Sequence, residues 1–263
     1  MARIGVAATA PFGADVLERL TVKHDVAFLL TRPDAQQGRG RKVAAPAAKI
    51  VAERLGIPVL QPERLDASVD LPADTIVAVA YGLLVPAELL ERHLWLNVHP
   101  SLLPRWRGAA PIERAIMAGD TGTGVSIIKL VEALDAGPIG AQARFPISPE
   151  EDAGAVYESA AVTAARLLDP LPEQFTPQAE EGVTYADKIT AADRRLDLDR
   201  PADELVRRVR ALSPHIGARA ELEGRPVTVW RARVAEDGSF EPLEVQPEGG
   251  RRMDYAAWLH GLR

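Results

Sequence analysis

The stretch WLNVHPSLLPRWRGAAPIERAIMAGDTGTGVSIIKLVEALDAGPI, residues 95–139, organises the rest of the chain. The apolar run at residues 94–98 predicts a buried strand. Asn97 and His99 are two residues apart, so their side chains share one face of that strand. Pro100 cannot continue a central ladder and should end the strand, which places the polar pair at its carboxyl end. Open α/β sheets bind ligands at that end, and the sequence therefore predicts a functional site there.

A carboxylate follows the next apolar stretch. Asp135 lies in an expected loop with Gly137. A carboxylate near an imidazole holds the ring cationic and orients it, and an asparagine supplies a neutral N–H donor. Asn97, His99 and Asp135 together can stabilise an oxyanion and manage protons at a carbonyl under attack. If the substrate brings its own amine, the enzyme needs no separate nucleophile.

The same residues also allow a purely structural role or a different chemistry. A lone histidine at a strand end is commonly structural. Ser101 with His99 and Asp135 suggests a serine hydrolase, but Pro100 intervenes and the chain has no G-x-S-x-G elbow. A metal site is also disfavoured, because asparagine is a poor ligand, the chain has no cysteine, and no second histidine stands at ligand spacing. We therefore expect no metal.

The motif NVHPSLLPRWRGAAPI followed by LDAG resembles the signature of the methionyl-tRNA formyltransferases. The wider superfamily of 10-formyltetrahydrofolate-dependent formyltransferases shares its Asn, His and Asp. The resemblance covers nearly the whole chain. It implies that Asn97, His99 and Asp135 are catalytic, that 10-formyltetrahydrofolate is the co-substrate, and that methionyl-initiator-tRNA accepts the formyl group.

Short buried strands expected at residues 2–8, 25–31 and 74–82 alternate with helical patterns, which predicts an α/β fold with a doubly wound, mostly parallel sheet. The first turn, AATAPFG, is not G-x-G-x-x-G, so dinucleotide binding is not predicted. We expect Phe12 in a loop. The resemblance puts an aromatic side chain that contacts the methionyl group at this position. A loop phenylalanine packed on its own domain is the alternative.

Residues 31–50, TRPDAQQGRGRKVAAPAAKI, lack periodicity and predict an exposed loop. The loop carries a basic cluster of Arg39, Arg41 and Lys42. Such a cluster is usually only solvated, and its spacing is not that of a P-loop. By resemblance, this loop enters the acceptor end of initiator tRNA, where basic side chains contact phosphates and bases.

The resemblance also implies the folate contacts. The exit of the third strand resembles a segment that lines the pterin pocket, and the loop after His99 lies near both substrates. Arg105 and Arg107, which flank Trp106, are further candidates for substrate binding, because arginine binds phosphate or carboxylate. The residues expected at the folate are Tyr81, Gly82, Leu83, Leu84, Ser101, Leu102, Leu103, Pro104 and Asp135.

A chain of 263 residues can hold one large or two moderate domains. We expect a catalytic domain at residues 1–168, a proline-rich linker at 169–183, and a second domain at 184–263 with a helix at 201–212 followed by three strands. The second domain resembles an OB-like tRNA-binding domain, but the chain between Val234 and Glu241 is shorter than the family pattern. Closure of its barrel is therefore in question.

Composition and net charge indicate where the protein works and what it can bind. The net charge of −6 argues against a nonspecific nucleic-acid coat but allows a local basic patch. The chain has no cysteine, no apolar run long enough for a bilayer and no secretory pattern, and we expect a cytoplasmic monomer that does not bind membranes. Two other functions stay open: a formyltransferase whose acceptor is a sugar-nucleotide amine or water, and a non-catalytic folate- or RNA-binding module.

Overall fold

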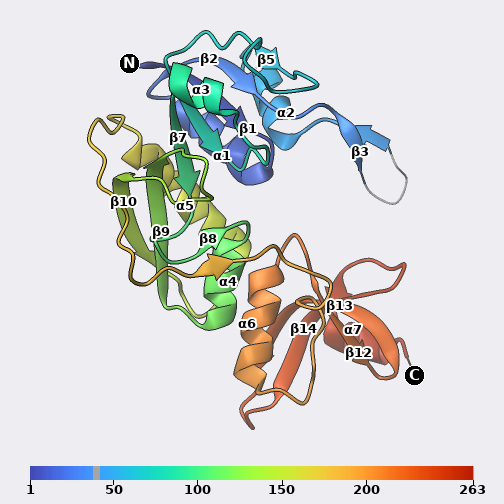
Figure 1. Cartoon of the computed structure of the whole chain (residues 1–263). Coiled ribbons are helices and arrows are strands. Elements are labelled where there is room, and N and C mark those ends of the chain that lie inside the picture. The colour runs from blue at the N-terminus through green and yellow to red at the C-terminus, as the bar shows by residue number, and fades with distance from the viewer. Residues whose placement is uncertain (38–41, 263) are drawn as a thin grey trace. The chain divides into compact units, whose positions relative to one another are not determined.

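The computed structural model describes residues 1–37 and 42–262 (Figure 1). Its larger sheet has seven strands. The strand order is β10-β9-β7-β6-β1-β2-β5. The pairs β1–β2, β1–β6, β2–β5 and β6–β7 are parallel, and β7–β9 is antiparallel. The prediction of a mostly parallel α/β sheet is confirmed. The strands are β1 (Arg3–Ala8), β2 (Asp25–Leu30), β5 (Val59–Leu60), β6 (Thr75–Val79), β7 (Leu94–His99), β9 (Gly122–Lys129) and β10 (Ile139–Pro146).

The middle strands of this sheet are buried on both faces. Ile76 and Ala78 of β6 belong to a buried cluster that also holds Phe28 and Trp95. The alternate residue Val77 is also fully buried. Burial of successive residues explains why these strands read as continuous apolar runs. The helices of this part of the chain are α1 (Pro11–Leu20), α2 (Ala47–Arg54), α3 (Ala87–Arg92) and α5 (Ala153–Leu167).

Three local predictions were wrong. Helix α1 begins at Pro11, so Phe12 lies in its first turn and not in a loop; proline suits this position because the first helical N–H has no intrahelical partner. Strand β6 ends at Val79 and not at residue 82, because Ala80 has a φ of 46° and leaves the extended conformation. Residues 31–50 were expected to be an exposed loop, but they contain regular structure. Strand β3 (Ala35–Gln37) pairs antiparallel with β4 (Lys42–Ala44) before α2 begins.

The chain divides into two compact units. The first comprises Met1–Arg107, Gly124–Arg144 and Glu158–Val183, and the second comprises Gly108–Thr123, Phe145–Tyr157 and Thr184–Arg263. Residues 169–183 therefore pack within the first unit. Thr176 and Ile139 exchange backbone hydrogen bonds of 2.8 and 2.9 Å, which fix this proline-rich segment beside β10.

The second unit contains an antiparallel sheet in the order β12-β13-β14-β15. Leu205, Val209 and Leu212 of α6 follow helical spacing and pack in one core with Val229 and Val245. The predicted small β-rich domain is confirmed, whereas β15 and α7 were not expected. Among described residues, β12 and β15 are the edges of this sheet. The elements are β8 (Arg107–Gly108), α4 (Pro111–Ala118), β11 (Tyr185–Ala186), α6 (Ala202–Leu212), β12 (Ala218–Leu222), β13 (Arg225–Val234), β14 (Phe240–Pro247), β15 (Met253–Asp254) and α7 (Tyr255–His260).

Candidate active site

Strand β7 positions the two polar side chains that the sequence singled out. It lies between β6 and β9, and His99 is its last residue, directly before Pro100. Asn97 pairs with Ala78 of β6, so the site lies at the carboxyl end of neighbouring parallel strands. The His99 residue is 4% exposed. The imidazole is therefore held in a nearly dry environment, where hydrogen bonds fix its orientation.

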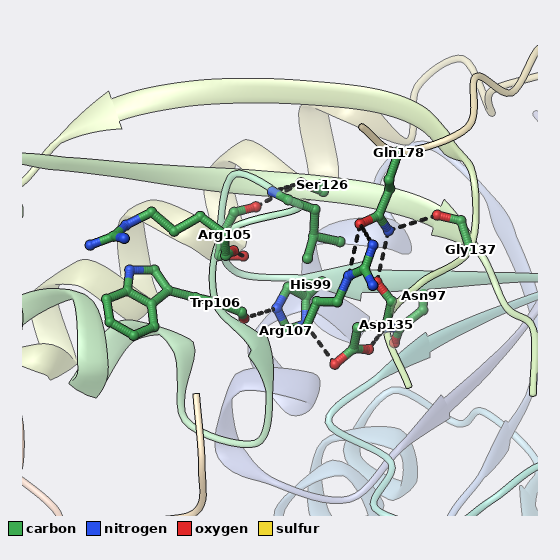
Figure 2. Close-up of polar contacts among 11 residues, drawn as sticks. Asn97, His99, Arg105, Trp106, Arg107, Ser126, Asp135, Gly137 and Gln178 are labelled. Atoms are coloured by element: carbon green, nitrogen blue, oxygen red, sulfur yellow. Dashed lines mark hydrogen bonds and ion pairs between the residues drawn. The ribbon is translucent and has the colours of Figure 1, made fainter. Parts of the chain in front are cut away.

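The loop after β9 brings a carboxylate to this pair. The Asn97 amide donates from Nδ2 to Asp135 Oδ1 over 3.2 Å, and His99 Nδ1 lies 3.6 Å from Asp135 Oδ2 (Figure 2). Asp135 has a φ of 47°, a left-handed conformation that aspartate tolerates better than most residues. Three side chains separated by up to 38 residues thus converge, as the sequence predicted.

The other ring nitrogen of His99 faces a backbone carbonyl. His99 Nε2 lies 2.7 Å from the carbonyl oxygen of Trp106, whose φ is 65° (Figure 2). A carbonyl oxygen only accepts, so Nε2 carries a hydrogen and donates. The Asp135 carboxylate lies beside Nδ1, so the ring has an oxygen neighbour at each of its two nitrogens.

A glutamine joins the two segments that flank His99. Gln178 Oε1 accepts from Arg107 Nε over 3.0 Å and from Arg107 Nη2 over 2.7 Å. Its Nε2 donates to the carbonyl oxygens of Asp135 and Gly137 over 2.7 and 2.8 Å (Figure 2). Sequence reasoning missed Gln178 because it stands in the expected linker, where no periodicity points to a role. It also missed the Trp106 carbonyl, since a backbone atom leaves no sequence signal.

The loop that follows His99 is fixed by its own hydrogen bonds. Ser101 is fully buried, and its hydroxyl donates to the carbonyl oxygen of Arg105 over 2.7 Å. Ser126 Oγ donates to the Ser101 carbonyl oxygen over 2.7 Å and accepts from Leu103 N over 3.1 Å. The Gln142 amide donates to the Leu103 carbonyl oxygen over 3.1 Å. The Ser101 hydroxyl is therefore part of the loop's scaffold, an arrangement that disfavours it as a nucleophile.

The remaining candidates for the folate side follow β6 and His99. Tyr81 is buried, and this burial raises the pKa of its hydroxyl to about 12, so the phenol stays protonated at neutral pH. Gly82 has a φ of 77°, while Leu83 and Leu84 are exposed. The parallel pairing of β6 and β7 puts this segment at the same edge of the sheet as Asn97. In the other loop, Leu103 is buried, and Leu102 and Pro104 are half-buried.

The candidates for the acceptor side are described only in part. Phe12 is half-buried in the first turn of α1. Arg39 and Arg41 lie outside the described residues. Lys42 begins β4, and its side chain lies outside the described part of the structure. The guanidinium of Arg105 lies 4.3 Å from the centre of the Trp106 ring, a cation–π contact.

Residues 1–37 and 42–262 hold no group of three or more His, Asp and Glu side chains that could bind a metal ion. Over the same ranges, none of the helices has the length and apolar character needed to cross a bilayer.

This chain is similar to known proteins over most of its length. The model for "Formyl transferase" matches residues 3–169, and the model for "Formyl transferase, C-terminal domain" matches residues 188–242. The methionyl-tRNA formyltransferase of Paracoccus denitrificans (strain Pd 1222) is 40% identical, with 97% of this chain and 95% of the relative covered.

Two solved structures share the fold. Methionyl-tRNA formyltransferase from Clostridium thermocellum is 14% identical with a TM-score of 0.65 and covers 97% of this chain and 100% of its own. HypX from Aquifex aeolicus in complex with tetrahydrofolic acid is 19% identical with a TM-score of 0.66 and covers 98% of this chain and 47% of its own. At these identities the likeness supports the fold alone.

Proposed function

Because this chain belongs to the methionyl-tRNA formyltransferase family, we propose that Asn97, His99 and Asp135 move a formyl group from 10-formyltetrahydrofolate to the α-amine of methionyl-initiator-tRNA. The observation that carries the proposal is the convergence of an amide, an imidazole and a carboxylate at the carboxyl end of β7. The relatives' names supply the tRNA substrate, and the resemblance of the NVHPSLLPRWRGAAPI motif implies the folate donor.

The reaction is an acyl transfer between two amines. The neutral α-amine attacks the formyl carbon and forms a C–N bond, and the carbonyl electrons move to the oxygen. The resulting oxyanion accepts hydrogen bonds from the Asn97 amide and from cationic His99. The attacking nitrogen loses a proton, the departing folate nitrogen gains one, and the old C–N bond breaks. The products are tetrahydrofolate and formylmethionyl-tRNA.

Asp135 has two tasks in this scheme. Its carboxylate orients the His99 imidazole and steers the proton that passes from the attacking nitrogen to the leaving nitrogen. The Asn97 amide carries two hydrogens, of which one is donated to Asp135 Oδ1.

The rest of the chain serves the two substrates. Tyr81–Leu84 and Ser101–Pro104 hold the folate, while Phe12, Arg105 and Arg107 contact the acceptor together with the basic cluster Arg39, Arg41 and Lys42. We assign residues 1–168 to catalysis, 169–183 to a connection that packs within the first unit, and 184–263 to an OB-like tRNA-binding domain. The enzyme works without a metal, in the cytoplasm. We expect it to act as a monomer.

The acceptor can be tested directly. The protein is incubated with 10-formyltetrahydrofolate and methionyl-initiator-tRNA, and the amino acid released from the tRNA is identified by mass spectrometry. Parallel reactions offer a nucleotide-linked amino sugar or water alone. We expect formylmethionine from the tRNA and little formylated sugar or tetrahydrofolate from the controls. Faster formylation of the sugar, or faster hydrolysis of the donor, would refute the proposed acceptor.

A further inference from the structure

We infer that Gln178 is a positioning residue for the active site, which holds Asp135 and the Trp106–Arg107 segment in register on the two sides of His99. The inference rests on the proposed function. Gln178 is half-buried in a segment without regular structure, about 40 residues away in the chain from the loop that it contacts. Its contacts with that loop and with Arg107 are all hydrogen bonds of 3.0 Å or less.

The chemistry of these contacts fixes which way the amide points. Arginine only donates, so the amide oxygen must face Arg107. Carbonyl oxygens only accept, so the amide nitrogen must face Asp135 and Gly137. A flipped amide would place donor against donor and acceptor against acceptor. The side chain is therefore locked in one orientation by partners on both sides.

The position of Gln178 connects it to both ring nitrogens of His99. Gln178 donates a hydrogen bond to the carbonyl oxygen of Asp135, and the carboxylate of Asp135 lies beside His99 Nδ1. Arg107, which Gln178 also binds, directly follows Trp106, whose carbonyl oxygen faces Nε2. Gln178 thus spans the two segments that orient the imidazole.

The loop around Asp135 needs such support. Asp135 has a left-handed backbone with a φ of 47°, which still costs free energy for a residue other than glycine and which contacts from its surroundings offset. Lys129 N donates to the Pro138 carbonyl oxygen over 3.0 Å and closes the base of the loop. Gln178 binds two carbonyl oxygens inside this closed turn. Loss of these bonds should let the Asp135 carboxylate drift from the imidazole without unfolding the sheet.

The test compares two glutamine-to-glutamate changes in the same segment. Gln178→Glu keeps an acceptor for Arg107 but removes both donors to the Asp135 loop. Gln174→Glu makes the same charge change four residues earlier, at an exposed side chain. We expect Gln178→Glu to lower kcat for methionyl-tRNA about 10- to 100-fold, because a misplacement of about 1 Å costs rate and not binding. The KM values for tRNA and folate should stay within about threefold of wild type. Gln174→Glu should change neither.

Measurements in an Asp135→Ala protein distinguish a positioning role of Gln178 from a general effect on stability. If Gln178 acts through Asp135, Gln178→Glu should change the single-turnover rate of an Asp135→Ala protein by less than about twofold. Gln178→Met, which removes all four bonds without adding charge, should repeat the kcat loss. The inference would be overturned if folded Gln178→Met kept the wild-type kcat. It would also be overturned if Gln178→Glu slowed the Asp135→Ala protein by the same factor as it slows wild type. Absence of formylation by the wild-type protein would instead remove the function on which it rests.

Discussion

At the scale of single residues, Glu113 gives a test that is independent of catalysis. This carboxylate of α4 is 8% exposed, and its oxygens accept from the Tyr157 hydroxyl over 3.2 and 3.3 Å. Burial raises the pKa of Glu113, and the hydrogen bonds offset this only in part. The pKa is therefore higher in the folded than in the unfolded protein. Its stabilising contribution is complete below the unfolded value of about 4.3 and is lost as pH rises through the folded value.

Glu113→Gln removes this titration. The stability of the variant relative to wild type should rise as pH increases from about 4 to 8, because only wild type pays for a buried charge at the higher pH. Urea unfolding of both proteins across that range measures the difference. Two curves that run parallel over the whole range would show that Glu113 does not titrate differently in the folded state.

The sequence could point to candidate residues of the site where a side chain follows a regular pattern. The alternation of β7 put Asn97 and His99 on one face, and the family motif supplied Asp135. Gln178 escaped notice because its role depends on where a non-repetitive segment folds back. The Trp106 carbonyl escaped notice because its direction depends on a φ of 65°, which no residue type reveals.

At the scale of elements, strands that are buried on both faces were the easiest to predict. Burial requires continuous apolar residues, as in β1 and β6, and this leaves a clear trace. The pairing of β3 with β4 could not be predicted from the sequence, because strands of three residues are too short to show an alternation of apolar and polar residues. The start of α1 was missed because Pro11 also suits a loop.

The turn between β9 and β10 gives the prediction at this scale. Gly137 is buried, and a Cβ there would overlap the carbonyl oxygen of Lys129. Gly137→Ala should therefore displace the Asp135 loop. We expect a loss of about 1–3 kcal/mol in the free energy of unfolding from overpacking. We also expect about a 10²-fold loss in turnover from misplacement of Asp135.

Gly250→Ala is the matched control. The nearest atom to an added Cβ at Gly250 is the Pro247 carbonyl oxygen at 3.3 Å, a contact that a small shift relieves. This variant should keep its turnover and its midpoint of thermal unfolding. If Gly137→Ala is as active as Gly250→Ala, the tight turn does not position Asp135.

At the scale of the whole molecule, the fold brings the candidate site together from segments that lie far apart in the sequence. Residues 97–99 end a strand, residue 135 follows the neighbouring strand, and residue 178 returns from a segment more than 40 residues later. The family motif pointed to Asn97, His99 and Asp135 as candidates, whereas the contacts of Gln178 are visible only in the structure. Composition pointed to a linker there, because prolines and acids are typical of linkers whether or not the segment packs against a domain.

The account as a whole depends on the chemistry of three side chains, and one measurement tests it most directly. Asn97→Ala, His99→Ala and Asp135→Ala are compared with wild type in single-turnover formylation of methionyl-tRNA, with both substrates saturating. Thermal unfolding midpoints confirm that each variant is folded. We predict that each rate falls by about 10² to 10³, the usual cost of losing one oxyanion donor or its support. Near-wild-type rates in all three folded variants would contradict the account.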